Sequence, residues 1–210
     1  MTEKEPEVIR DTSRLELVIG LIIAIFAAVL AINDLGAGRY GDDEKIAHNK
    51  HTEMYNWYQS KSIKQALFKG QIELLQALSR AEALQPQYKS AVDNNIEVLQ
   101  KKIDKYEKEM KEIQLGSAAI GQANWAQEQD GKLGQITGAQ QWRDIYEKLG
   151  VAGDSYDLGT LFLQLCLVFG AIGLITQADA VRKGFVIMMV ILGSIGTYYC
   201  VQAYLIAFSV

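Results

Sequence analysis

Three polar side chains near the first apolar stretch have the spacing of a metal-binding group. Glu44, His48 and His51 lie four and three residues apart, so a helix that begins near Asp42 would place all three on one face. Carboxylate and imidazole groups are ordinary ligands of transition metals. However, the chain has only 2 histidines and no fourth ligand is evident. We therefore expect no metal site, and a metal bound by this trio is the alternative.

The other reactive side chains do not form a catalytic pattern. Cys166 and Cys200 lie inside strongly apolar segments, where a thiol usually acts as a small apolar side chain. Serine, histidine and acidic residues do not take the arrangement of a nucleophile motif. The segment GSAAIG, residues 116–121, matches neither a phosphate-binding loop nor a dinucleotide fingerprint. We expect a protein that is not an enzyme and binds no cofactor.

The apolar residues are concentrated in three runs. Hydrophobic residues make up 49% of the chain and charged residues 22%, but nearly all the charge lies between the first and second runs. A run of about 18 or more apolar residues is long enough to cross a hydrocarbon core about 30 Å thick. The sequence predicts an all-α membrane protein with transmembrane helices at residues 15–33, 158–176 and 185–208.

The first apolar run has a competing interpretation as a cleaved signal peptide. Basic residues precede it in the segment 1–14, as they do in signal peptides. The run is longer than the apolar core of such peptides, which has about 7 to 15 residues, and no small-x-small cleavage site clearly follows it. We expect a retained helix that anchors the chain in the lipid bilayer.

Basic residues in the short segments predict the orientation. They occur in the segment 1–14 and, as Arg182 and Lys183, in the predicted turn 177–184. The positive-inside rule places both segments in the cytoplasm and the segment 34–157 outside a bacterial inner membrane, on its periplasmic or extracytoplasmic side. Three tyrosines then fall near the outer interface: Tyr40, Tyr156 and Tyr204. The opposite orientation stays open because basic residues also follow the first helix: Arg39, Lys45 and Lys50.

The segment 34–157 is predicted to hold an antiparallel helical hairpin that resembles a coiled coil. Its arms are about 42–85 and 87–114, after a helix-breaking segment DLGAGRYG, and Pro86 turns the chain between them. Apolar or small residues recur every four and three positions, which is typical of a coiled-coil seam. In the first arm they are Ile63, Leu67, Gly70, Leu74, Ala77, Ala81 and Leu84. In the second arm they are Tyr88, Val92, Ile96, Leu99, Ile103, Tyr106, Met110 and Ile113.

Two further segments complete the central region. In the run KKIDKYEKEMKE, residues 101–112, lysine and glutamate alternate around the seam residues. Opposite charges cancel there, so we expect a solvated helix face and no nucleic-acid partner. The segment 115–140 is rich in glycine and lacks periodicity. Because glycine weakens a helix, this segment is predicted to face a partner or to rearrange locally.

Small and aromatic residues indicate packing surfaces. In the first membrane helix, small residues recur every four positions, and small residues let membrane helices approach closely. Trp57 and Tyr58 either thicken the start of the hairpin core or anchor a partner, since aromatic residues are favoured in contact cores. The candidate packing or contact residues are Gly20, Ala24, Ala28, Trp57, Tyr58, Gly170, Gly173, Gly193 and Gly196. We expect self-association or inclusion in a larger membrane protein complex.

A resemblance to a known family starts at the same aromatic residues. NWYQSKSIKQALF, residues 56–68, resembles the Trp-x-Tyr-Gln-x-Lys-Ser-Ile-Lys-Gln signature of a bacterial family of inner-membrane proteins, classed as a domain of unknown function. YDLGTLFLQLCLVFGAIGLIT and VILGSIG are similar to the closing pair of membrane helices of that family. The segment from about 115 to 140 departs from it. The resemblance implies a multi-pass membrane protein and no reaction.

Two functions of different classes fit the sequence. The first is a non-catalytic membrane-anchored scaffold or accessory subunit, which forms an oligomer or docks on a larger complex through its hairpin and its small-residue helix faces. The second is a subunit of an oligomeric channel or transporter. Transport sites usually contain ionisable residues inside the membrane. The predicted spans contain only uncharged polar groups such as Gln164, with Glu16 at one edge, so the scaffold is favoured.

Overall fold

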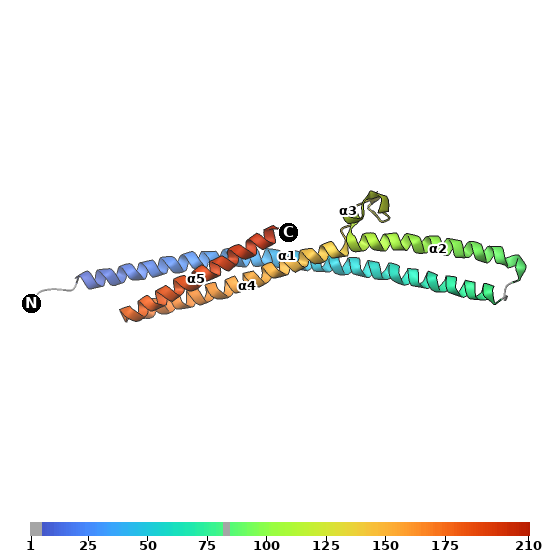
Figure 1. Ribbon diagram of the computed structural model, residues 1–210. Coiled ribbons are helices and arrows are strands. Elements are labelled where there is room, and N and C mark those ends of the chain that lie inside the picture. Colours follow the sequence, from blue (N-terminus) through green and yellow to red (C-terminus); the bar gives the residue numbers. More distant parts are fainter. Residues whose placement is uncertain (1–5, 82–84) are drawn as a thin grey trace, which may run out of the picture. The chain divides into compact units, whose positions relative to one another are not determined.

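The computed structural model describes residues 6–81 and 85–210, with side chains from Leu15 onward, and helices dominate these residues (Figure 1). Part of the predicted segment 1–14 and Leu84 of the predicted seam lie outside the described residues. The long helices are α1 (Pro6–Arg80), α2 (Pro86–Leu115), α4 (Ala139–Ile175) and α5 (Asp179–Phe208). Between α2 and α4 come α3 (Ser117–Ile120), the 3-10 turn η1 (Gln122–Asn124), and strands β1 (Glu128–Gln129) and β2 (Lys132–Leu133).

The described residues include three helices that are long and apolar enough to cross a membrane, as the sequence predicts. They are the part of α1 that begins at Leu15, α4 and α5. The chain divides into two compact units. The membrane unit contains the residues up to Glu44 and those from Glu147 to Val210, and the helical unit is Lys45–Tyr146. Helices α1 and α4 each contribute to both units.

The predicted helix break at residues 34–41 is wrong, because α1 is continuous through this segment. Glycine costs a helix roughly 1 kcal/mol relative to alanine, and tertiary contacts offset this cost. A Cβ atom at Gly36 would lie 3.0 Å from the ring of Tyr156 on α4, so the glycine permits a close approach of the two helices. Next to it, Tyr40 stacks on Tyr156 with 6.1 Å between ring centroids.

The other membrane helices also differ at their ends from the prediction. Helix α4 begins at Ala139 and continues without a break through the predicted start of the second span at residue 158. Helix α5 already begins at Asp179, so only residues 176–178 separate α4 from α5, in place of the predicted turn 177–184. Arg182 thus lies within the first turns of α5 and is buried.

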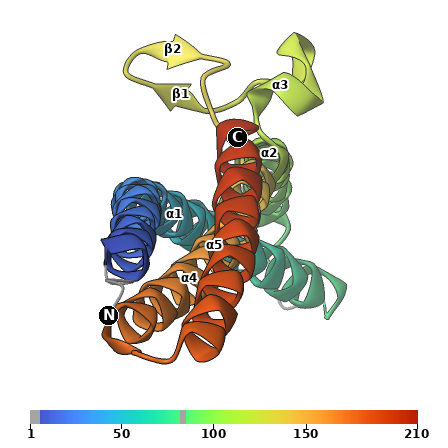
Figure 2. The same ribbon diagram turned by 90° about the vertical axis from the view of Figure 1, so that its left-hand side faces the viewer.

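The core of the membrane unit is formed by α1, α4 and α5. Ile19, Cys166 and Met189 are fully buried together, one from each helix. Partly buried apolar side chains surround them: Leu15, Ile22, Ile23, Phe26, Phe169, Val186 and Leu192. Both cysteines are free thiols, and Cys166 packs as an apolar side chain in this core. Figure 2 views these three helices from the end at which the described chain begins.

In the helical unit, α1 packs against α2 (Figure 1). Phe68 stacks on Tyr106 with 5.8 Å between centroids, and Lys61 forms an ion pair with the buried carboxylate of Glu109. The opposite side of α2 is solvated. There Lys101 pairs with Glu97 at 2.7 Å, and this hydrogen bond and charge lower the pKa of the Glu97 carboxyl.

The two predicted seams have different outcomes. On α2 the predicted face is covered, since Ile103, Met110 and Ile113 are buried and only Tyr88, at its first turn, is exposed. On α1 the predicted face is exposed, so this prediction is wrong. The covered face of α1 instead has its own four-three spacing: Met54, Tyr58, Lys61, Gln65, Phe68, Ile72, Leu75 and Ser79. Because polar residues interrupt this set, its periodicity is weaker in sequence than that of the exposed set.

Candidate functional sites

An apolar stripe on α1 has no covering segment among the residues that the structure describes. We define the α1 stripe by four large side chains and the small residues between them. The exposed fractions are 55% at Ile63, 62% at Leu67, 61% at Leu74 and 38% at Leu78. The small residues are Ala66, Gly70 and Ala77, all exposed. The stripe is offset by two residues, or about 200° around the helix, from the face that α2 covers. Helix α1 thus carries apolar side chains on two faces. One face packs against α2, and the other, the α1 stripe, is exposed.

Aromatic rings extend along α1 on the N-terminal side of the stripe. His51 stacks on Tyr55, which stacks on Tyr58, with centroids 6.4 Å apart in each pair. Tyr146 of α4 meets the rings of His48 and His51 edge-on at 5.2 and 5.5 Å. Tyr58 and Trp57 are half-buried, so these aromatic residues lie where the covered face of α1 begins. Whether they also contact a partner stays a prediction.

The two histidines are engaged in packing in the helical unit. His51 Nδ1 lies 2.9 Å from the backbone oxygen of Ala139, which accepts a hydrogen bond from the ring. Glu44, the third member of the predicted trio, belongs to the membrane unit, where its carboxylate lies beside Gly150 and Gly153. Among the described residues, no group of three or more His, Cys, Asp or Glu side chains is placed to hold a metal ion.

A buried carboxylate organises the glycine-rich segment. Glu112 is fully buried at the end of α2. Its Oε1 accepts a hydrogen bond from the Ser117 hydroxyl at 2.7 Å, and its Oε2 accepts from the backbone N–H groups of Ala126 and Gln127 at 2.7 Å each. The Ser117 hydroxyl in turn accepts from the N–H of Ile136 at 2.9 Å. The Glu112 side chain therefore connects the segment to α2 at Ser117, Ala126 and Gln127.

The same segment contains a two-stranded β ribbon, and a tight turn connects its strands. Asp130 and Gly131 connect β1 to β2, and both have a positive φ, 51° and 76°. Two-residue turns of this kind match the twist of paired strands. Gly134 also has a positive φ of 81°, and a Cβ atom there would lie 2.5 Å from the Trp125 ring. Figure 2 shows the ribbon next to α3.

The candidate packing residues of the membrane unit fall into two groups. A Cβ atom at Gly170 would lie 2.7 Å from Ile23 and from Met189, and one at Gly193 would overlap the Phe26 ring. Gly173 and Gly196 face Phe185 and Leu163. By contrast, a Cβ atom at Gly20 would meet nothing within 4 Å in the described part of the chain, and Ala24 and Ala28 are exposed. These four glycines of α4 and α5 thus pack internally, whereas the small-residue ridge of α1 faces outward.

At one end of the membrane unit, Arg182 joins the α4–α5 turn to α1. Its Nε donates to the backbone oxygen of Thr176 at 2.8 Å, and its guanidinium lies 3.4 Å from the Glu16 carboxylate. The Arg182 side chain is buried, whereas that of Glu16 is 46% exposed. The two charges that the sequence places at the edges of separate apolar runs therefore form an ion pair.

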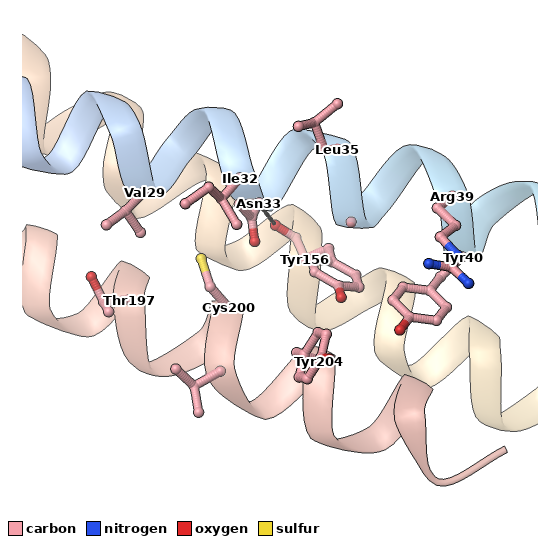
Figure 3. A pocket seen from close by; sticks show the side chains of 12 residues that line it. Val29, Ile32, Asn33, Leu35, Arg39, Tyr40, Tyr156, Thr197, Cys200 and Tyr204 are labelled. Atoms are coloured by element: carbon pink, nitrogen blue, oxygen red, sulfur yellow. Dashed lines mark hydrogen bonds between the residues drawn. The ribbon is translucent and has the colours of Figure 1, made fainter.

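The membrane unit also contains a pocket between α1, α4 and α5. We call it the membrane pocket; its volume is about 450 Å³. Figure 3 shows the rings of Tyr40, Tyr156 and Tyr204 at one end of it. Tyr204 meets Tyr40 edge-on at 6.5 Å, and the Arg39 guanidinium lies 5.8 Å from the Tyr40 centroid. The rest of the lining is mostly apolar: Val29, Ile32, Leu35, Gly36, Thr197, Cys200 and Val201.

Two polar groups in the wall of this pocket are buried and incompletely satisfied. Asn33 and Tyr156 are each 2% exposed. The Asn33 amide donates to the backbone oxygen of Tyr156 at 3.1 Å and to the Thr160 hydroxyl at 2.8 Å. Asn33 Oδ1 and the Tyr156 hydroxyl have no hydrogen-bond partner among the residues that the structure describes. A buried polar group without a partner lowers the stability of a fold by about 1–3 kcal/mol. The burial of these two atoms is therefore unfavourable for folding.

Comparison with known families identifies the chain. The model of the family described as Domain of unknown function (DUF4337) matches residues 15–206. The chain belongs to this family. No curated protein and no solved structure matches the chain. The DUF4337 match covers the three helices that are long and apolar enough to cross a membrane, up to residue 206 of α5, and the whole helical unit. The α1 stripe and the membrane pocket therefore both lie inside the family domain. The Trp57–Gln65 signature and the bacterial origin stay predictions.

Sequence reasoning missed three features of this DUF4337 chain. The dipeptide Asp130–Gly131 is a strong turn signal and could have located the β ribbon. Asn33 is the polar residue that ends the predicted first span, residues 15–33, and this position could have marked it as a candidate. Glu112 carried no usable signal, because in the sequence it is one of several alternating charges.

Proposed function

We propose that the protein is a non-catalytic membrane-anchored scaffold that self-associates through the α1 stripe. The observation that carries this proposal is the exposure of Ile63, Leu67 and Leu74, spaced four and seven residues apart, on a helix whose other face is already covered by α2. Large apolar patches exposed to water indicate an interaction site. The spacing is that of a helix that packs against another helix.

The partner that fits best is a second copy of the chain. Two copies anchored in one membrane run their α1 helices in the same direction, so equivalent residues of the stripe meet in parallel. The small residues Ala66, Gly70 and Ala77 allow a close approach. In a parallel coiled coil, the residue at heptad position g, directly before a seam residue at position a, faces the e residue five positions later in the partner helix. These flanking pairs would be Gln59 with Lys64, Ala66 with Gln71, and Glu73 with Leu78. None brings like charges together, so charge does not oppose the association.

The proposal includes an arrangement in which Lys45–Arg80 of α1 and α2 form an antiparallel hairpin outside the membrane. The contacts of Phe68 with Tyr106 and of Lys61 with Glu109 support it. The residue that comes later on α1 contacts the residue that comes earlier on α2, as in an antiparallel pair. The basic residues Arg182 and Lys183 support an extracytoplasmic hairpin on a bacterial inner membrane. Labelling a Ser90→Cys variant in intact cells with an impermeant thiol reagent tests this location, and protection of Cys at position 90 contradicts it.

Native mass spectrometry of the full-length chain in a gentle detergent tests the self-association. The expected result is an oligomer for the wild type and dissociation for a Leu67→Glu/Leu74→Glu variant, because the glutamates would put like charges into the seam. The matched control is Val98→Glu/Leu133→Glu, which changes two exposed apolar residues, 50% and 53% exposed, outside the stripe. A wild type that is monomeric and without partners, or a control that dissociates equally, contradicts the proposal.

A channel or transporter subunit is the second class of function. Conductance of the purified protein in planar bilayers distinguishes the two classes. A current that persists in the Leu67→Glu/Leu74→Glu variant would indicate a pore built by the membrane unit and would contradict the scaffold proposal.

A further inference from the structure

We propose that the membrane pocket binds an anionic phospholipid whose headgroup carries hydroxyl groups. The proposal is independent of self-association, because every residue of the pocket wall belongs to the membrane unit of one chain. It stands on three observations: two unsatisfied buried polar atoms, a change from apolar to charged lining along α1, and exposed apolar side chains at the rim of the pocket.

The two unsatisfied atoms specify the hydrogen-bonding chemistry of the ligand. Asn33 Oδ1 is an acceptor and needs an O–H or N–H donor. The Tyr156 hydroxyl can both donate and accept. Both side chains are 2% exposed and contribute to the lining of the pocket (Figure 3). A ligand with hydroxyl groups satisfies both atoms, since each hydroxyl offers one donor and can accept.

The lining changes character along α1 in the way that a lipid changes along its length. Val29 and Ile32 belong to the apolar run, Asn33 follows directly, and Arg39 lies seven residues beyond Ile32. At about 1.5 Å per residue, Arg39 is about 10 Å farther along the helix axis than Ile32. An acyl chain would contact Val29 and Ile32, and Arg39 would attract the phosphate. The hydroxylated headgroup is attached beyond the phosphate and would fold back from Arg39, so that its hydroxyls reach Asn33 and Tyr156.

The exposure of the rim favours a ligand that comes from the bilayer. Ile32, Leu35 and Val201 line the pocket and are 70%, 77% and 53% exposed. In a membrane-crossing segment, apolar side chains with this exposure contact lipid. Tyr204, also in the lining, is 51% exposed, and tyrosine is favoured at headgroup level. A lipid can therefore enter without passing through water.

Lipid titration of the full-length chain, followed by native mass spectrometry in a mild detergent, tests the proposal. Three lipids with identical acyl chains separate the contributions. Phosphatidylglycerol is anionic with a hydroxylated headgroup, phosphatidic acid is anionic without it, and phosphatidylcholine is neutral overall without a donor. The expected order of affinity is phosphatidylglycerol, then phosphatidic acid, then phosphatidylcholine.

Two variants assign the binding to the pocket. Tyr156→Phe removes an atom that has no hydrogen-bond partner in the described part of the chain, so we expect the variant to fold. It should weaken the binding of phosphatidylglycerol about three- to ten-fold, the effect of one hydrogen bond. The affinity for phosphatidylcholine should not change. Arg39→Gln should weaken the binding of both anionic lipids about ten-fold. The matched controls are Tyr198→Phe, whose ring is 65% exposed on α5 outside the lining, and Lys183→Gln, an exposed basic residue of the same helix.

Two outcomes would overturn the proposal. One is equal affinity of the wild type for phosphatidylglycerol and phosphatidylcholine. The other is a preference for phosphatidylglycerol that survives both Tyr156→Phe and Arg39→Gln, which would place the lipid elsewhere. Because Arg39 is exposed, its variant keeps the fold and reports on the site independently of Tyr156→Phe.

Discussion

Leu67 and Phe68 are neighbours in sequence but lie on different faces of α1. Leu67 is 62% exposed, whereas Phe68 is half-buried, stacks on Tyr106 at 5.8 Å and lies under the ammonium group of Lys102 at 5.4 Å. One step along the helix, about 100° of rotation, therefore separates a residue that holds α1 to α2 from one that faces away from α2.

This relationship predicts opposite behaviour of two alanine variants. Phe68→Ala removes a ring from the contact between α1 and α2 and should destabilise the helical unit by about 2–4 kcal/mol. Leu67→Ala should change the stability of the monomer by less than about 0.5 kcal/mol. Hydrogen exchange of α2 peptides in the dissociated full-length chain measures the difference. Equal loss of protection in the two variants would mean that the covered face of α1 is assigned wrongly.

Helix α1 shows that apolar spacing alone does not determine which face of a helix is covered. Four-three spacing predicted helices and the covered face of α2 correctly, because the apolar set of α2 has no rival. Helix α1 carries two such sets. The regular one, with Ile63, Leu67 and Leu74, is exposed, and the one with Lys61 and Gln65 among its members is covered. Lys61 is tolerated there because it pairs with Glu109 and lies 5.2 Å from the Tyr106 centroid. Sequence periodicity cannot anticipate this compensation.

The predicted break after the first membrane helix failed for a related reason. Glycines in DLGAGRYG lower the helix propensity of the segment, but propensity describes an isolated helix. Gly36 allows the ring of Tyr156 to approach α1, and Tyr40 stacks on that ring. The contacts come from residues more than a hundred positions away and outweigh the local preference. The three apolar spans were predictable because their length alone is sufficient.

Glu112 is expected to control the folding of the glycine-rich segment. Glu112→Ala would leave the Ser117 hydroxyl and two backbone N–H groups without their acceptor, which should cost about 2–5 kcal/mol locally. Glu112→Gln keeps one acceptor oxygen and should cost less. Limited proteolysis measures the result, with new cleavage between residues 117 and 136. Glu107→Gln, at an exposed position of α2, is the control and should leave the segment protected. An intact segment in Glu112→Ala would contradict this role.

The ion pair of Arg182 with Glu16 should couple the α4–α5 turn to α1. Because the Glu16 side chain is 46% exposed, screening limits the interaction, and we expect a coupling energy of about 0.5–1.5 kcal/mol. Arg182→Gln should cost more than Glu16→Gln, because it also removes the hydrogen bond to Thr176. A double-mutant cycle from thermal unfolding in detergent gives both values. Lys183→Gln serves as the matched control. Additive effects of the two substitutions would show that the charges do not interact in the folded chain.

Alanine at two membrane glycines should shift stability in opposite directions. At Gly193 a Cβ atom would overlap the Phe26 ring, and overpacking of this kind costs about 1–3 kcal/mol. At Gly20 a Cβ atom meets nothing within 4 Å among the described residues, so Gly20→Ala should stabilise α1 by up to about 1 kcal/mol through lower backbone entropy of the unfolded chain. The midpoints of thermal unfolding in detergent, measured under conditions where both variants are monomeric, compare the two. A shift of the same sign in both would contradict the assignment of Gly193 to the internal contact with Phe26 and of Gly20 to the outward face of α1.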